Sequence, residues 1–199
     1  MAVVKIDPML LQGPWTDGRV LERQHTLSSD FLGYDSNGNP QFDTKRSELG
    51  ELVFRLKNRN DKKALDSIAD TAVEFLRSWN PPFDLIVPVP ASRQRAGFQP
   101  VVEIAKAIGE RLSKPVATTA ISKGKSTPEL KNVFEYQRRL ELLDGAFDVD
   151  AQTVENRRVL LVDDLFRSGA TAAAATKALL AGGAVAVYLL AMTKTRTRS

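Results

Sequence analysis

Residues 158–171 read RVLLVDDLFRSGAT, and this stretch decides the fold. Its first half is a run of branched aliphatic residues that ends in two adjacent aspartates, which is typical of a strand buried on both faces of a parallel sheet. Its second half contains a Ser-Gly pair and leads into the alanine-rich stretch 170–181, which is followed by Gly182-Gly183. Paired glycines at that place are a signal for the end of a helix. The stretch therefore predicts one strand–turn–helix unit of an α/β protein.

The rest of the chain predicts helices and strands in alternation. Apolar residues recur every three or four positions in the stretches that we expect to be helical, and short apolar runs bounded by turn formers mark the strands. The further helices are expected over residues 49–58, 65–79, 99–112 and 133–143, and the further strands over residues 84–90, 116–121 and 184–192. Because strands alternate with helices of 10–15 residues, we expect an α/β fold with a doubly wound, mainly parallel sheet flanked by helices.

The first 46 residues have a different character. They contain few periodic apolar positions and many turn formers, and we expect a hairpin about the Asn37-Gly38 turn. We therefore divide the chain into a small N-terminal segment, residues 1–46, and an α/β domain, residues 47–199. A chain of 199 residues is long enough for one substantial core.

The composition excludes several classes of protein. The sequence has no apolar run of 18 residues, so we expect no membrane span, and its first residues do not read as a secretory signal. The absence of cysteine excludes disulfides and thiolate metal sites and fits a cytoplasmic location. His25 is the one histidine, which argues against a His-rich metal site or a Ser-His-Asp triad, and we interpret it as an ordinary histidine of the N-terminal segment.

The chemistry of the chain is expected where the 158–164 strand ends. Ligands of open α/β sheets sit at the carboxyl ends of the strands, and Asp163 and Asp164 lie at that end. Two adjacent carboxylates are too costly to bury without partners. They suit the two vicinal hydroxyls of a ribose, and they can also orient a hydrated Mg²⁺.

The turn that follows is suited to a phosphate. Gly169 allows a positive φ or a close approach of the backbone, while Ser168 and Thr171 supply hydroxyl donors. The free N–H groups and the positive end of the helix add to an anion pocket of the size of a phosphate monoester. Carboxylates for a ribose followed by a phosphate pocket match the order of a ribose 5-phosphate.

Residues 159–171, VLLVDDLFRSGAT, resemble the thirteen-residue signature of the type I phosphoribosyltransferases. In that signature four hydrophobic residues precede two acidic residues and a hydroxyl-rich Gly loop. Three further stretches are similar, in order and spacing, to the ComF-like branch of the family. They are LKNRND (56–61), DLIVPVPASRQRAGFQPVVEIAKAI (84–108) and STPELKNVFEYQRRLELLDGAF (126–147), so the resemblance covers roughly residues 50–193.

The resemblance implies a role for each matching residue. Asp163 and Asp164 would hold the ribose hydroxyls and Mg²⁺, and residues 122–132 would form the flexible catalytic loop. The 5-phosphate would be bound by Arg167, Ser168, Gly169, Ala170 and Thr171. The pyrophosphate would be bound by Ala91, Ser92 and Arg93. The negative charge of the leaving group would be neutralised by Arg93, Lys123, Lys125 or Lys131. Lysines in such a loop can also be plain solvent-facing charges.

Two features depart from the family pattern. Arg167 stands where the loop usually has Thr or Ser, and it would either grip the phosphate or point to solvent or a partner chain. The cysteine-rich zinc element that opens many ComF-like proteins is absent, so residues 1–46 would form a metal-free hood-like segment. The hood selects the acceptor in this family. Phe31, Tyr34 and Phe42 could stack on a base there, and apolar packing is at least as good an interpretation.

Two functions follow as expectations. The first is a Mg²⁺-dependent phosphoribosyltransferase that transfers ribose 5-phosphate from 5-phosphoribosyl 1-pyrophosphate to an unidentified nitrogenous acceptor and releases pyrophosphate. The alternative is a ComF-like protein that binds such a ligand without turnover and acts in DNA uptake or regulation. Basic patches and a net charge of +4 allow a nucleic-acid partner, and folds of this size often form homodimers. No GxGxxG follows an early strand, which argues against a dinucleotide-binding fold.

Overall fold

The computed structural model describes residues 2–91, 97–124, 142–143 and 145–195. Its centre is a five-stranded sheet in the order β1-β2-β9-β8-β5. Strand β1 is antiparallel to β2, whereas β2, β9, β8 and β5 are all parallel to one another. The bounds are β1 (Met9–Leu10), β2 (Asp17–Glu22), β5 (Leu85–Pro88), β8 (Arg158–Phe166) and β9 (Ala186–Lys194). The expected mainly parallel α/β sheet is therefore confirmed.

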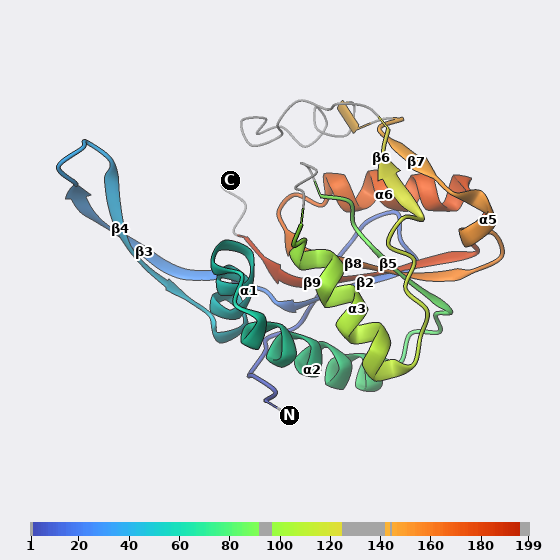
Figure 1. The fold of residues 1–199 in the computed structure, drawn as a ribbon, viewed down its shortest axis with the longest axis horizontal. Coiled ribbons are helices and arrows are strands. Elements are labelled where there is room, and N and C mark those ends of the chain that lie inside the picture. Colours follow the sequence, from blue (N-terminus) through green and yellow to red (C-terminus); the bar gives the residue numbers. More distant parts are fainter. Residues whose placement is uncertain (1, 92–96, 125–141, 144, 196–199) are drawn as a thin grey trace.

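Helices cover both faces of this sheet (Figure 1). Helix α6 lies on one face, and α1, α2 and α3 lie on the other. Strand β8 shows why both faces are filled, since Val159 and Leu161 pack in the α6 layer while Leu160 and Val162 pack in the opposite layer. The bounds are α1 (Glu48–Arg59), α2 (Lys62–Trp79), α3 (Pro100–Leu112) and α6 (Ala170–Ala181).

Helices α1 and α2 begin and end at residues suited to those places. Ser47 caps α1, and its side-chain oxygen accepts the N–H of Gly50 at 3.1 Å. Asp61 caps α2 in the same way, and the two helices end at Asn60 and Asn80 with left-handed backbone. The bounds expected from the apolar period are thus confirmed to within a few residues.

The strand expected over residues 116–121 is not formed. Val116 makes only an isolated parallel bridge to Ile86, and a turn at residues 118–119 follows. The chain then forms β6 (Ile121–Lys123), which pairs antiparallel with β7 (Phe147–Val149) outside the central sheet. A four-residue helix, α5 (Ala151–Val154), leads from β7 to β8. The helix expected over residues 133–143 lies almost entirely outside the described residues.

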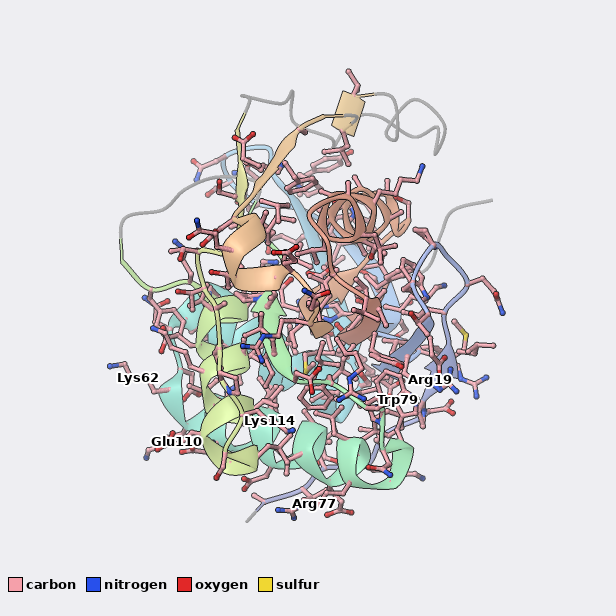
Figure 2. All side chains as sticks on the ribbon, turned by 90° about the vertical axis from the view of Figure 1, so that its right-hand side faces the viewer. Arg19, Lys62, Arg77, Trp79, Glu110 and Lys114 are labelled. Carbon is pink, nitrogen blue, oxygen red and sulfur yellow. The ribbon has the colours of Figure 1, made fainter. Side chains whose placement is uncertain are left out.

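The N-terminal segment contributes two strands to the central sheet. Strand β2 pairs with β9 along most of its length, a role that the sequence pattern did not indicate. It is also tied to α2, because the indole Nε1 of Trp79 donates to Asp17 Oδ2 at 2.9 Å. The guanidinium of Arg19 lies 5.5 Å from the Trp79 ring centroid, and Figure 2 shows these two side chains next to each other. The start of the chain is thus built into the core.

The hairpin expected about Asn37-Gly38 is confirmed, and it projects from the body of the molecule (Figure 1). It consists of β3 (Thr26–Tyr34) and β4 (Pro40–Arg46). Asp35 organises the turn, since one carboxylate oxygen accepts the N–H groups of Asn37 and Asn39 at 2.9 and 2.8 Å. Within the described part of the chain, no helix is both long and apolar enough to cross a lipid bilayer.

Candidate functional site

The two aspartates lie at the carboxyl edge of the sheet, although they do not end their strand. Strand β8 continues through Phe166, and Asp163 is paired with Ala191 of β9. On the other side, β5 ends with Pro88 opposite Val162. The expectation that the strand stops at the aspartates is therefore corrected, because β9 supplies a hydrogen-bonding neighbour for two more residues, Leu165 and Phe166. The carboxylates occupy the step where β5 ends and β8 goes on.

Burial and like charge dominate the electrostatics of this pair. The pKa of Asp163 is raised to about 7, mainly because burial penalises the carboxylate and then because the charge of Asp164 is adjacent. Lys57 opposes this rise, and its Nζ lies 2.9 Å from Asp164 Oδ2. The Asp164 side chain is only 13% exposed, so this ion pair is well sheltered on the aspartate side. The Asp163 carboxyl therefore holds its proton more tightly than usual, and a bound cation or hydroxyl donor would stabilise its ionised form.

A second connection reaches Asp164 from the N-terminal segment. The hydroxyl of Thr193 donates to the Asp164 carbonyl at 3.3 Å, and His25 Nδ1 lies 3.0 Å from the same hydroxyl oxygen. Because the threonine proton is used in this bond, we infer that His25 donates through Nδ1–H. The pKa of His25 is lowered, first by burial and then by Arg46 and Lys57, so the ring is neutral at pH 7. His25, which we expected to be an ordinary histidine of the N-terminal segment, thus contacts β9 through Thr193.

The turn after β8 places a glycine with left-handed backbone at the start of α6. Gly169 adopts φ +79°, and a Cβ built on it would lie 2.6 Å from the Phe166 ring, so this position requires glycine. Gly169 is also the N-cap of α6 and has no side chain to accept the first helical N–H groups. Ser168 Oγ approaches the Ala170 N–H at 3.5 Å. Ser168 thus accepts one N–H of the helix start, while further N–H groups of the first turn have no acceptor within the helix.

The remaining residues of the turn differ in exposure. Arg167 is exposed and Thr171 is half-buried, so both side chains can be reached from the solvent side. Ala170 is 1% exposed, and its methyl group belongs to the α6 core layer. Of Ala170, only the backbone N–H remains as a candidate ligand group. The turn can thus offer backbone donors, hydroxyls and one guanidinium.

The expected pyrophosphate segment and catalytic loop are only partly described. Val89 N–H donates to the Val162 carbonyl at 2.8 Å, so Ala91 begins the segment that leaves the sheet next to Asp163. Lys123 ends β6, where burial lowers its pKa and its Nζ lies 5.9 Å from the Phe147 ring centroid. The side chains of Ser92, Arg93, Lys125 and Lys131 lie outside the described residues. Their roles, and that of Lys123, stay predictions.

A cavity also exists at the opposite end of the strands. It has a volume of about 310 Å³, and its lining includes Arg77, Lys114 and Arg158. Figure 2 shows Arg77 and Lys114 on this side. Arg158 is already held by both carboxylate oxygens of Asp84, at 2.9 and 2.7 Å, which lowers the pKa of Asp84 to about 2. The amino edge of the sheet therefore has an ion pair between Asp84 and Arg158 beside this cavity.

Sequence reasoning missed Lys57, His25 and Thr193 as residues of the site. Lys57 falls inside LKNRND, but the helical period showed only that it follows the buried Leu56. Thr193 lies just beyond the apolar run expected as the last strand. Lys57, His25 and Thr193 come close to Asp164 only because β9 and α1 lie beside β8. This arrangement is visible in the fold and not in the sequence.

Comparison with known proteins supports the fold of the chain but gives no evidence about its activity. No protein-family model matches the sequence, and no curated protein sequence matches it either. Among solved structures, the chain is similar to glutamine phosphoribosylpyrophosphate amidotransferase from B. subtilis, with 16% identity and a TM-score of 0.50 over 79% of this chain and 34% of that one. It is also similar to adenine phosphoribosyltransferase from Giardia lamblia, with 13% identity and a TM-score of 0.48 over 84% and 94% of the two chains.

The UMP synthase of Leishmania donovani is a further match, with 17% identity and a TM-score of 0.42 over 81% of this chain and 27% of that enzyme. The chain thus spans about a third of the amidotransferase and about a quarter of the UMP synthase. At these identities the likeness shows a phosphoribosyltransferase-like fold, and the activity has to be argued from the site.

Proposed function

We propose that this chain binds 5-phosphoribosyl 1-pyrophosphate with Mg²⁺ and transfers its ribose 5-phosphate to a nitrogenous acceptor. One observation carries the proposal: the Asp163–Asp164 pair is followed, on the same edge of the sheet, by a left-handed glycine that opens α6 without a side-chain cap. Carboxylates that accept from hydroxyls and a helix start that binds an anion are the two halves of a ribose 5-phosphate site.

The phosphate half is built from backbone. The N–H groups in the first turn of α6 have no acceptor within the helix, and the helix dipole places positive potential there. Ser168 and Thr171 add hydroxyls beside this turn, and the exposed Arg167 can add a guanidinium. A 5-phosphate at this place would accept from several donors at once, which fixes one end of the ligand.

The ribose half is built from the paired carboxylates. In the ligand-free chain Lys57 neutralises Asp164, while Asp163 has the raised pKa. Two vicinal hydroxyls could donate to these oxygens and leave the ring of the sugar between the aspartates and the helix start. The 2.9 Å contact with Lys57 would then hold the Asp164 carboxylate in place for the sugar.

The aspartates also fit Mg²⁺, on the chemistry of the donor set. Hard oxygen ligands and unrelieved negative charge are what this ion prefers, and it usually takes one or two carboxylates together with substrate phosphates and water. The described residues contain no group of three or more His, Cys, Asp or Glu side chains that could hold a metal by themselves. We therefore assign Asp163 and Asp164 to the ion jointly with the ligand. The Mg²⁺ ion would neutralise the negative charge of the departing diphosphate.

The reaction that we propose breaks the bond between C1′ and the diphosphate oxygen and forms a bond from C1′ to the acceptor nitrogen. The electron pair of the broken bond leaves with pyrophosphate, which also takes up the proton that the acceptor nitrogen loses. Because the leaving diphosphate develops negative charge, Arg93, Lys123, Lys125 or Lys131 would neutralise it, and water would have to be excluded from the C1′ centre. The acceptor is not assigned.

Calorimetry of the full chain with 5-phosphoribosyl 1-pyrophosphate at millimolar MgCl₂ tests the binding. We expect saturable binding that falls at least 30-fold in Asp163→Asn/Asp164→Asn. The exposed carboxylate of Glu74 on α2 provides the matched control, and Glu74→Gln should bind like the unchanged chain. A wild-type chain that does not bind the ligand, or a double variant that binds as well as the control, contradicts the proposal.

Turnover needs its own assay, namely release of pyrophosphate across a panel of nucleobases and simple amines. Release with one acceptor class, lost in the double aspartate variant, supports the transferase. Tight binding without release for any acceptor supports the non-catalytic ComF-like binder instead. A ComF-like relation rests on the sequence resemblance over residues 56–61, 84–108 and 126–147.

A further inference from the structure

The cavity at the amino edge of the sheet, here called the amino-edge cavity, has a lining that is partly apolar and partly basic. Its volume of about 310 Å³ is at the lower end of the range of about 300–1,000 Å³ for small-molecule sites. Leu76 and Phe83 belong to the apolar part and are 3% and 8% exposed. The basic part comes from three separate segments and consists of Arg77, Lys114 and Arg158, of which Figure 2 labels the first two. One small molecule of mixed character fits this lining.

The positive charges of the amino-edge cavity exceed the negative ones. Among the described residues that line it, Asp84 is the only carboxylate, and its ion pair with Arg158 cancels one cation. Helices α2 and α3 end at the cavity, and because a helix end carries about half a negative charge, the two ends offset about one cation more. About one positive charge remains, and a hollow with such an excess raises the local concentration of anions.

Two of the three cations are held in position by their neighbours. Asp84 accepts from Nε and Nη2 of Arg158 at 2.9 and 2.7 Å, and its Oδ2 also accepts the Arg158 backbone N–H at 3.2 Å. This pairing leaves the N–H groups of Nη1 for a further acceptor. Lys114 Nζ lies 5.6 Å from the Phe83 ring centroid, within the range of a cation–π contact. Residues 80–82, Asn-Pro-Pro, border the cavity, and the two prolines fix φ there. An anion would therefore meet donors that are already ordered, which lowers the entropy cost of binding.

We propose that the amino-edge cavity binds a small phosphate monoester whose organic part is apolar. A phosphoryl group has three terminal oxygens, so it can accept from Arg77, Lys114 and Arg158 at the same time, whereas a carboxylate has only two oxygens for the same donors. The organic part would cover the apolar lining at Leu76 and Phe83 and remove it from water. The phosphate fixes one end of the ligand, and the apolar lining selects what is attached to it.

The amino-edge cavity lies apart from the Asp163–Asp164 pair. Arg158 begins β8 and Asp163 follows five residues later, so the two are about 17 Å apart at a rise of roughly 3.3 Å per residue. A ligand small enough for the cavity does not span this distance. The inference therefore goes beyond the proposed function and does not rest on it.

Titration of the ¹⁵N-labelled full chain with phenyl phosphate, followed by amide NMR, tests the proposal residue by residue. We expect saturable shifts in residues 76–84 and 112–114 with a dissociation constant below about 1 mM, and roughly fivefold weaker binding of inorganic phosphate, which lacks the apolar part. The same shifts should persist in Gly169→Ala, since this residue lies at the other edge of the sheet. Shifts that do not saturate by about 20 mM, that are confined to residues 168–172, or that are lost in Gly169→Ala overturn the proposal. Equal affinity for inorganic phosphate overturns its apolar part.

Variants of the lining show whether its cations bind the phosphate or only balance the helix ends, with circular dichroism to confirm that each variant is folded. Lys114→Met and Arg77→Gln should each weaken the binding of phenyl phosphate about tenfold, because each removes a charge-assisted donor. Lys62, in the first turn of the helix that carries Arg77, provides the control, and Lys62→Met should bind like the unchanged chain. Arg158→Gln/Asp84→Asn removes both partners of the ion pair, so neither charge is left unpaired, and it should weaken binding by a similar factor. Folded lining variants that bind as tightly as the control overturn the proposal.

Discussion

Lys57 Nζ lies 2.9 Å from Asp164 Oδ2, although the two residues are 107 positions apart in the chain. Helix α1 carries the lysine to the carboxyl edge of the sheet, where its positive charge partly offsets the rise in the pKa of Asp163. Removing this cation leaves the two adjacent carboxylates without the positive charge that offsets their mutual repulsion. We therefore expect Lys57→Met to raise the pKa of Asp163 further above 7, as measured by NMR of ¹³C-labelled aspartate carboxyls.

The conservative variant Lys57→Arg keeps the charge and should leave that pKa close to its original value. Lys62, which begins α2, provides a second control, and Lys62→Met should have no effect on the pKa of Asp163. An Asp163 titration that is the same in Lys57→Met and in the unchanged chain would show that the ion pair does not form in solution.

The raised pKa of Asp163 makes folding stability depend on pH. Its folded-state pKa is about 7 against 3.8 in the unfolded chain, so below pH 3.8 both states are protonated and this group costs nothing. As the pH rises from 3.8 to about 7 the unfolded state ionises while the folded state stays protonated, so stability is lost until both states are ionised above pH 7. Between pH 5 and pH 8 the loss is on the order of 3 kcal/mol, at about 1.36 kcal/mol per pKa unit.

Urea denaturation at pH 5 and pH 8 measures this loss in the free energy of unfolding. We expect Asp163→Asn to remove most of the difference between the two values, because an amide does not titrate, while Glu74→Gln should retain it. A wild-type chain that is equally stable at both values, or more stable at pH 8, would contradict the raised pKa.

Much of the fold was predictable because its core elements have local signals. Strand β8 is apolar on both faces, α6 begins after Gly169 and ends at Gly182, and the hairpin contains an Asn-Gly turn. Strand β2 was not predictable, because DGRVLE contains both charged residues and a glycine. Its place depends on pairing with β9, which lies more than 160 residues further along the chain.

The candidate site was predictable only where its residues adjoin in sequence. Asp163, Asp164 and the 167–171 turn form one continuous segment, so their chemistry could be inferred together. Lys57, His25 and Thr193 come from three other segments, and sequence spacing says nothing about pairs of that kind. The length of β8 was also missed, since only the partner strand β9 shows that hydrogen bonding continues to Phe166.

Gly169 combines a left-handed backbone with a close neighbour, and the two effects can be separated. We expect Gly169→Ala to destabilise the protein by about 2–3 kcal/mol, because the positive φ alone costs roughly 1–2 kcal/mol and the new methyl group would meet the Phe166 ring. For a chain of this size that corresponds to a melting temperature lower by roughly 5–10 °C. Differential scanning calorimetry measures the change.

Gly38 is the matched control, since its φ of +78° is nearly the same and open space surrounds the position of its Cβ. Gly38→Ala should show only the backbone cost. Equal losses in the two variants would mean that the Phe166 ring moves aside without strain. If the proposed function is right, Gly169→Ala should also weaken binding of inorganic phosphate, and Gly38→Ala should not.

Thr193 links the histidine of the N-terminal segment to the backbone of the aspartate pair. Its side chain is fully buried, and Thr193→Val keeps the shape while removing the hydroxyl that contacts both His25 Nδ1 and the Asp164 carbonyl. Leaving buried polar groups without a partner costs about 1–3 kcal/mol, so we expect a loss of that size in urea denaturation. The same substitution should change the tautomer of His25, because Nδ1–H loses its acceptor. ¹⁵N NMR of the single imidazole should therefore show Nδ1–H in the unchanged chain and a shift toward Nε2–H in the variant. An Nε2–H tautomer in the unchanged chain would contradict the proposed direction of the His25–Thr193–Asp164 hydrogen bonds.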